Sequence, residues 1–109
     1  MTVIAILPSI FSTHFRFNLV TTATTTVTVS NKLGMHARPA MLLAEVAGRF
    51  SSSITVSHDA HDPVDAKSIM QLMLLAATKG TNLHITADGD DASQAVQELE
   101  SLVKAGFNE

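Results

Sequence analysis

The chain has no cysteine, which excludes disulfide bonds and thiolate metal sites and is typical of a reducing compartment. It also has no apolar run near the ~18 residues that a membrane-spanning helix needs. We therefore predict a cytoplasmic protein that does not insert into a membrane.

Charged residues are scarce as well, at 16% of the 109 residues, whereas about a quarter is usual. The formal net charge is −3, and the seven Lys and Arg are scattered along the chain. This pattern gives no reason to expect nucleic-acid binding. The hydrophobic fraction of 46% and the length fit a single domain with its own core, which we expect to be a monomer.

The N-terminal residues form a separate segment. No Lys or Arg precedes their first apolar run, and no small-residue cleavage site follows it, so they do not resemble a secretory signal. The segment holds three of the five phenylalanines. We assign residues 1–22 to an appendage that covers the open face of a sheet, pairs with an edge strand or associates with another chain, and residues 23–109 to the domain.

Periodicity then predicts the elements of the domain. Residues 24–31 alternate as a strand does, and residues 37–50 carry apolar side chains at the intervals of an amphipathic helix. Residues 52–66 predict a hairpin that turns near Asp59, and Pro63 in its second arm marks an edge strand.

The second half of the domain predicts three further elements. Residues 67–80 predict a helix that stops at Gly80, residues 81–89 a strand, and residues 90–107 a helix capped by Asp90. The order strand, helix, strand, strand, helix, strand, helix favours an α+β fold with the helices on one face of an antiparallel sheet.

His36, Arg38 and Pro39 stand together at the predicted start of the first helix, in the run LGMHARPA. Proline is harmless in a first turn, because its missing N–H has no intrahelical partner there. The free N–H groups, the helix dipole and the Arg38 guanidinium then create an anion site beside the imidazole. A histidine placed there is a nucleophile that can carry a phosphoryl group, although a histidine at a helix start is more often only a polar residue at a solvated end.

The run LGMHARPA resembles the active-site signature of HPr, the family of histidine phosphocarriers of the bacterial phosphoenolpyruvate-dependent sugar phosphotransferase system. The resemblance covers about residues 24–105, including AKSIMQLMLLAATKGT and ITADGDDASQAVQEL. It implies an open-faced β-sandwich in the order βαββαβα, with a four-stranded antiparallel sheet and three helices on one face. It also implies a carrier and not an enzyme, in which His36 takes phosphate on Nδ1 from Enzyme I and passes it to enzyme IIA domains while Arg38 assists.

Ser68 opens the second helix and should act as its N-cap. HPr proteins with this KSIM segment are commonly phosphorylated on the serine by HPr kinase/phosphorylase, so the resemblance implies a regulatory site at Ser68. A phosphate there would place about two negative charges beside the partner surface.

The second helix has more apolar residues than a core-facing side needs, and we expect Leu72 and Leu75 to serve the core. Methionine more often fills gaps in a core than it contacts partners. In HPr, however, the corresponding segment docks Enzyme I and enzyme IIA. The resemblance therefore assigns four residues to partner binding: Met41, Ile69, Met70 and Met73.

We predict no metal site and no cofactor. His58 and His61 flank the hairpin turn beside two aspartates, but loops collect such residues without binding a metal. Two other functions stay open: a regulatory paralogue, of a nitrogen branch or a Ser-phosphorylated effector type, that acts mainly by protein binding, and a ligand-binding module without covalent chemistry. The intact His36 and Arg38 argue against the first, and the sequence offers no pocket signature for the second.

Overall fold

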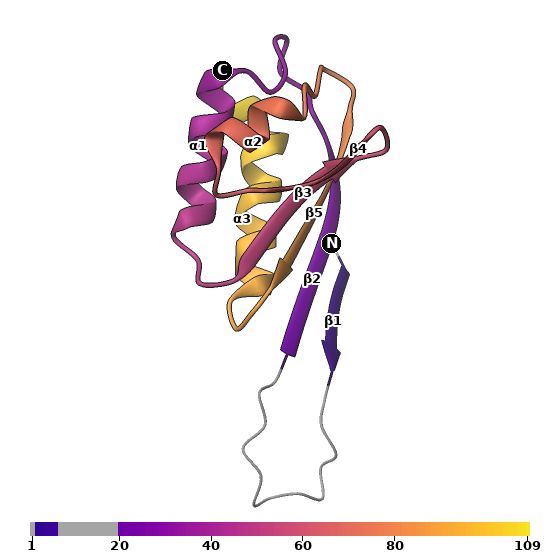
Figure 1. Cartoon of the computed structure of the whole chain (residues 1–109), viewed down its shortest axis with the longest axis vertical. Helices are drawn as coiled ribbons and strands as arrows, with labels where there is room; N and C mark the ends of the chain where they lie inside the picture. The colour runs from indigo at the N-terminus through magenta and orange to yellow at the C-terminus, as the bar shows by residue number, and fades with distance from the viewer. Residues whose placement is uncertain (1, 7–19) are drawn as a thin grey trace, which may run out of the picture.

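The computed structural model describes residues 2–6 and 20–109. Its strands form one antiparallel sheet in the order β1-β2-β5-β3-β4, made of β1 (Thr2–Ile6), β2 (Val20–Thr28), β3 (Ser53–His58), β4 (His61–Asp65) and β5 (Asn82–Asp88). Three helices cover one face of the sheet and leave the other face open (Figure 1): α1 (Ala37–Gly48), α2 (Ile69–Leu74) and α3 (Ala92–Lys104). A short 3-10 helix, η1 (Gly106–Asn108), follows α3. From β2 onward the order is βαββαβα, so the predicted α+β fold is confirmed.

The helix-covered face of the sheet is built from alternate residues of its strands. In the central pairing, Val27 lies opposite Leu83, and Thr25 lies opposite Ile85. All four side chains are buried. The Thr25 hydroxyl donates to a Glu100 carboxylate oxygen on α3 at 2.8 Å, so this polar group in the core row has a partner.

The helices supply the other half of the core with residues at intervals of three and four. From α1 these are Ala40, Leu43, Ala44 and Ala47, and from α3 they are Ala92, Ala95, Val96, Leu99 and Val103. Each large aliphatic side chain buried in this way stabilises the fold by about 1.5–3 kcal/mol. α1 ends at Gly48, earlier than predicted, but Phe50 is still buried beyond its end.

The prediction for α2 was right about its start and wrong about its end. Ser68 is the N-cap, and its hydroxyl accepts from the Gln71 N–H at 3.2 Å. The helix stops at Leu74 rather than at Gly80, because Ala76 takes a left-handed φ of 49° and turns the chain. This turn buries both Leu75 and Ala77, on either side of the exposed Ala76. A continued helix would place these two residues on nearly opposite faces, a little over half a turn apart.

The N-cap of α3 is Asp91, not the predicted Asp90, and its carboxylate does not cap its own helix. Instead it accepts hydrogen bonds from the backbone N–H of Ser51 at 2.8 Å and of Ser52 at 3.0 Å. The Ser52 hydroxyl donates to it as well. Asp91 therefore ties the start of α3 to the loop between α1 and β3.

We expect Asp91→Asn to lower the stability of the fold in a pH-dependent way. The hydrogen bond from the Ser52 side chain, followed by that from the Ser51 backbone, lowers the pKa of Asp91 from 3.8 to about 2. A group whose pKa is lowered by folding stabilises fully above its unfolded pKa, and this contribution is lost as the pH falls through the folded pKa. The difference in melting temperature between wild type and variant should therefore shrink as the pH falls through this window. Thermal unfolding followed by circular dichroism measures it, and a constant difference would contradict the assignment.

The N-terminal segment contributes a fifth strand. β1 pairs antiparallel with β2, with Thr2 opposite Thr24 and Ile6 opposite Val20. Of the three arrangements expected for the segment, Thr2–Ile6 adopt the pairing with an edge strand. β2 itself begins at Val20, earlier than the predicted Thr24. Residues 1 and 7–19, which include Phe11, Phe15 and Phe17, lie outside the described residues.

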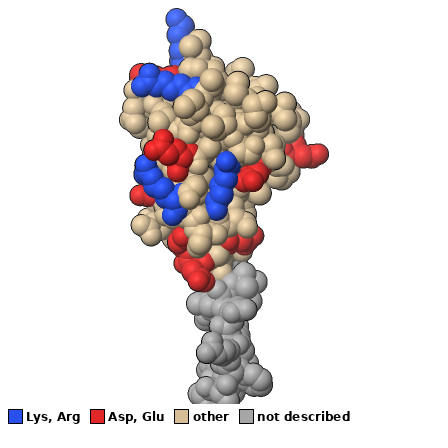
Figure 2. Space-filling view, turned by 60° about the vertical axis from the view of Figure 1, so that its left-hand side comes forward, with Lys and Arg blue, Asp and Glu red and all other residues tan. Residues whose placement is uncertain are grey.

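Charged side chains of both signs are interspersed over the face shown in Figure 2. They do not form the basic stripe that nucleic-acid-binding proteins present. Within residues 2–6 and 20–109, no helix combines the length and the apolar character needed to cross a bilayer.

Candidate functional site

The loop before α1 is held in one conformation by its own hydrogen bonds. The Asn31 side-chain amide donates to the Gly34 carbonyl at 2.8 Å, and the Met35 N–H donates to the Ala77 carbonyl at 2.7 Å. Gly34 has a φ of +67°, and a Cβ at this position would clash with the Ala77 carbonyl oxygen and lie 2.9 Å from the Thr78 Cα. A glycine is therefore required in the LGMH run, because the loop passes directly over the chain that follows α2.

His36 is the N-cap of α1, as predicted, with φ −94° and ψ −170°. Its carbonyl accepts the first helical hydrogen bond, from Ala40 N–H at 3.0 Å, but its side chain does not cap the helix. The imidazole is 35% exposed and is therefore within reach of a partner. Pro39 is buried in the first turn, and Arg38 is exposed beside it. The N–H groups of this turn have no intrahelical partner and carry the positive end of the helix dipole.

Glu109 completes the surroundings of His36. One of its carboxylate oxygens lies 2.9 Å from His36 Nε2, and the other accepts from the Asn31 amide at 3.0 Å. The hydrogen bond from Asn31, followed by that from His36 and the positive charges of His36 and Arg38, lowers the pKa of the Glu109 carboxyl. Glu109 is therefore ionised at neutral pH and can only accept hydrogen bonds.

This contact determines which ring nitrogen of a neutral His36 is free. Because the carboxylate only accepts, Nε2 must carry the proton and donate it to Glu109. In that tautomer the lone pair lies on Nδ1, which is the atom that a nucleophilic histidine uses. The arrangement places a nucleophilic nitrogen, the free N–H groups of a helix start and a guanidinium at one end of the domain, where they can receive an anionic group.

Glu109 is the site residue that the sequence prediction missed. It lies 73 residues after His36, and a single acidic residue after the last predicted helix gives no signal of a contact. The short helix η1 and the left-handed residues Phe107 and Asn108 turn the chain back toward α1. The fully buried Phe107 anchors this turn in the core.

The predicted apolar residues are exposed as expected. Ile69 is 40% exposed, Met70 74%, Met73 41% and Met41 55%, whereas Leu72 and Leu75 are buried in the core. The structure adds two exposed leucines that the prediction did not include, Leu74 at the end of α2 and Leu33 in the loop before His36. We call these six residues the apolar surface: Leu33, Met41, Ile69, Met70, Met73 and Leu74.

The other described histidines make contacts within the protein. His58 Nε2 lies 2.8 Å from the Leu75 carbonyl, and His84 Nε2 lies 2.9 Å from an Asp59 carboxylate oxygen. His61 Nδ1 lies 2.7 Å from the carbonyl of the adjacent Asp62. Within the described ranges, no three His, Asp or Glu side chains gather closely enough to hold a metal ion.

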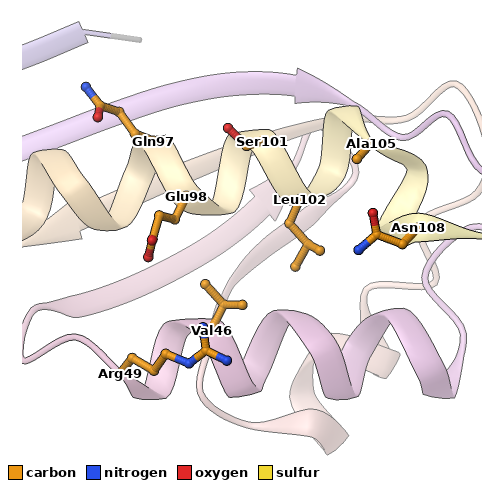
Figure 3. Close-up of a pocket in the computed structure, with 8 residues that line it drawn as sticks. All are labelled: Val46, Arg49, Gln97, Glu98, Ser101, Leu102, Ala105 and Asn108. Atoms are coloured by element: carbon orange, nitrogen blue, oxygen red, sulfur yellow. The ribbon is translucent and has the colours of Figure 1, made fainter.

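A groove of about 520 Å³ runs between α1 and α3, and none of the predicted site residues lines it (Figure 3). Val46 and Leu102 face one another across it, and Arg49 and Glu98 are the charged residues at its sides. Arg49 already pairs with Glu45 at 3.2 Å. The groove contains no histidine or other strong nucleophile, so it does not compete with the His36 region as the site of covalent chemistry.

The comparison with known proteins identifies the family of the chain. Residues 23–105 match the family model PTS-HPr, described as the PTS HPr component phosphorylation site. The chain is 43% identical to the Phosphocarrier protein HPr of Pseudomonas aeruginosa over 83 residues, which are 76% of this chain and 92% of that protein. It is also 38% identical to the Phosphocarrier protein NPr of Klebsiella oxytoca over 84 residues, which are 77% of this chain and 93% of that protein.

The fold matches solved structures of the same kind. The crystal structure of HPr-C-His from Thermoanaerobacter tengcongensis aligns with a TM-score of 0.75 and 40% identity, over 80% of this chain and 97% of that chain. An HPr from Bacillus anthracis aligns with a TM-score of 0.71 over 75% of this chain and 96% of that chain. The chain therefore belongs to the HPr family of phosphocarriers of the phosphotransferase system.

Proposed function

We propose that this phosphocarrier accepts a phosphoryl group from Enzyme I on Nδ1 of His36 and passes it to enzyme IIA domains, in the cytoplasm and as a monomer. The observation that carries the proposal is the contact of His36 Nε2 with the Glu109 carboxylate at 2.9 Å, which in a neutral imidazole favours the tautomer with its lone pair on Nδ1. The Nδ1 lone pair attacks phosphorus, a P–N bond forms, and the bond to the donor atom of Enzyme I breaks with its electron pair. The reverse sequence on a IIA domain returns His36 to its starting state.

Arg38 and the first turn of α1 stabilise the charge that the transferred group carries. The guanidinium is a fixed cation with a fork of donors suited to phosphate oxygens. The N–H groups at the helix start add donors and a positive dipole end. Because these groups are already in place before the transfer, little reorganisation is needed as the phosphoryl group arrives.

Incubation of the purified protein with phosphoenolpyruvate and Enzyme I tests the function directly. We expect a mass increase of one phosphoryl group that is lost in acid and retained in base, because P–N bonds are acid-labile. No mass increase, or one that survives acid, would contradict a phosphohistidine carrier.

The second candidate is a regulatory paralogue in a nitrogen branch, and the 38% identity to an NPr favours keeping it. The NPr relative is itself named a phosphocarrier, so the two candidates must be separated by their partners. We expect faster phosphorylation by the Enzyme I of the sugar system than by that of the nitrogen branch. The opposite order of rates would favour the paralogue.

We further propose that the apolar surface docks Enzyme I and enzyme IIA. Its methionines are flexible side chains that can fit several unrelated partners. α2 packs against α1, which begins at His36, so partners that reach the imidazole can also cover α2. Phosphorylation of Ser68 by a kinase would then place about two negative charges at the start of α2.

Ser68→Asp should weaken docking to Enzyme I without unfolding α2. Aspartate is also a good N-cap, so the hydrogen bond from Gln71 N–H can be kept. The added charge lies beside Ile69 and Met70, where desolvation by a partner would cost binding energy. Isothermal titration calorimetry should show about tenfold weaker binding, a difference of ~1.4 kcal/mol. Ser68→Asn is the matched control, because asparagine also caps a helix but carries no charge. If wild type, Ser68→Asp and Ser68→Asn bind Enzyme I equally, Ser68 acts only as the N-cap of α2.

Residues 23–109 should carry the phosphoryl group without the appendage. β1 pairs with β2 at the edge of the sheet, while His36, Arg38 and Glu109 lie on other elements. Deleting residues 1–19 keeps β2 whole, because this strand begins at Val20. We therefore expect the shortened protein to accept phosphate within about twofold of the full-length rate, a difference of less than ~0.5 kcal/mol in the activation barrier. If the shortened protein folds but does not accept phosphate, the N-terminal residues take part in the site.

A further inference from the structure

A second groove, of about 760 Å³, lies at the end of the domain near His36. Three lysines line it, and they come from segments far apart in the sequence. Lys32 lies in the loop after β2, Lys79 in the loop before β5, and Lys104 in the last turn of α3. In Figure 2, basic side chains stand at the end of the molecule opposite the grey atoms.

The groove concentrates positive charge in a chain whose net charge is −3. Three of the six Lys and Arg that the structure describes line it, and the acidic side chain that lines it is Glu109. Glu109 is already bonded to Asn31 and His36. Among residues 2–6 and 20–109, Lys32 and Lys79 make no ion pair, and the contact of Lys104 with Glu100 is long, at 3.8 Å. The lysines are therefore available to an anion from solution.

Asn31 gives a second and independent indication of a ligand. This residue is among those that line the same groove and is 6% exposed, and its side-chain amide nitrogen donates to the Gly34 carbonyl and the Glu109 carboxylate. Its Oδ1 is buried and has no hydrogen-bond partner within the described part of the chain. A buried acceptor without a donor is costly and rare in folded proteins. A hydroxyl group from outside the chain would satisfy it.

We propose that this groove binds a small phosphate monoester that also carries a free hydroxyl group. The phosphate oxygens accept from the ammonium groups of Lys32, Lys79 and Lys104, and the hydroxyl donates to Asn31 Oδ1. A phosphate dianion suits the groove better than a row of carboxylates on a protein, because the charges of a dianion lie on one small group that several lysines can approach together. The proposal goes beyond phosphoryl transfer and does not depend on it, since no covalent step is involved.

Titration of the full-length protein with glycerol phosphate, followed by backbone amide NMR, tests the site. We expect saturable shifts at Asn31, Lys32, Lys79 and Lys104 and none with glycerol alone. Lys79→Gln and Lys104→Gln should each weaken binding by about two- to fivefold, the range that exposed ion pairs support. Arg49→Gln, which removes an exposed cation from the other groove, is the matched control and should bind as wild type does.

Three outcomes would overturn the proposal. Equal weakening by all three substitutions would mean that the protein attracts anions only through its total charge. If glycerol phosphate causes no saturable shifts but a poly-glutamate peptide shifts the same amides, the lysines bind an acidic protein partner instead. If propyl phosphate, which lacks the free hydroxyl groups, binds as tightly as glycerol phosphate, no ligand hydroxyl donates to Asn31.

Discussion

We expect His36→Ala to abolish labelling by Enzyme I and phosphoenolpyruvate while the fold is kept. His36 is the one described histidine that stands at a helix start beside an arginine, and we propose that its Nδ1 forms the P–N bond. The side chain makes no cap hydrogen bond and is 35% exposed, so its removal leaves no buried group unpaired in α1. We expect no acid-labile mass increase in the variant and a circular dichroism spectrum equal to that of wild type.

His61→Ala is the matched control for this experiment. His61 is partly exposed like His36, but its ring lies near His58 and the carbonyl of the next residue, on the hairpin and away from a helix start. We expect full labelling of this variant. Labelling of His36→Ala at the wild-type level would show that another residue carries the phosphoryl group.

Arg38→Ala slows phosphoryl acceptance by about 100-fold, the loss that follows removal of one preorganised charge-stabilising donor from an active site. Arg38 is exposed in the first turn of α1 and packs into no part of the core. Its removal should therefore change the melting temperature by no more than about 2 °C, as is usual for surface substitutions in a domain of this size. Rapid-quench measurement of the transfer rate and a thermal melt on the same samples separate the two effects.

Arg49→Ala provides the control on the same helix. Arg49 lies just after the other end of α1, where its exposed guanidinium pairs with Glu45 four residues earlier. Arg49→Ala lowers the net charge of the protein by the same amount as Arg38→Ala, but it leaves the surroundings of His36 unchanged. If Arg38→Ala and Arg49→Ala slow the transfer equally, the effect of Arg38 comes from net charge and not from its position beside His36.

The position of His36 at the start of α1 could be predicted from sequence because its causes are local. A proline in the first turn and apolar residues at helical spacing determine where α1 begins, and this start makes His36 the N-cap. The alternating residues of β2 and β5 are local signals of the same kind, and they form the predicted buried rows.

The parts that could not be predicted depend on contacts between distant segments. Glu109 reaches His36 across 73 residues, through a turn that is anchored by Phe107. The start of α3 at Asp91 is another such case. The Asp91 carboxylate binds Ser51 and Ser52, which lie about 40 residues earlier, and the local sequence gives no sign of these contacts. The predicted end of α2 is wrong because it also depends on tertiary contacts. Leu75 and Ala77 are buried in the core, and this burial outweighs the helical tendency of their own segment.

We propose that Glu109 holds the proton on Nε2 of His36 and so directs the phosphoryl group to Nδ1. Nitrogen NMR of protein with isotope-labelled histidine, recorded after phosphorylation by Enzyme I, identifies the phosphorylated atom directly. Our account predicts that the nitrogen coupled to phosphorus is Nδ1 of His36 and that Nε2 keeps its proton. Phosphorus coupled to Nε2 of His36, or to a nitrogen of any other histidine, would contradict it.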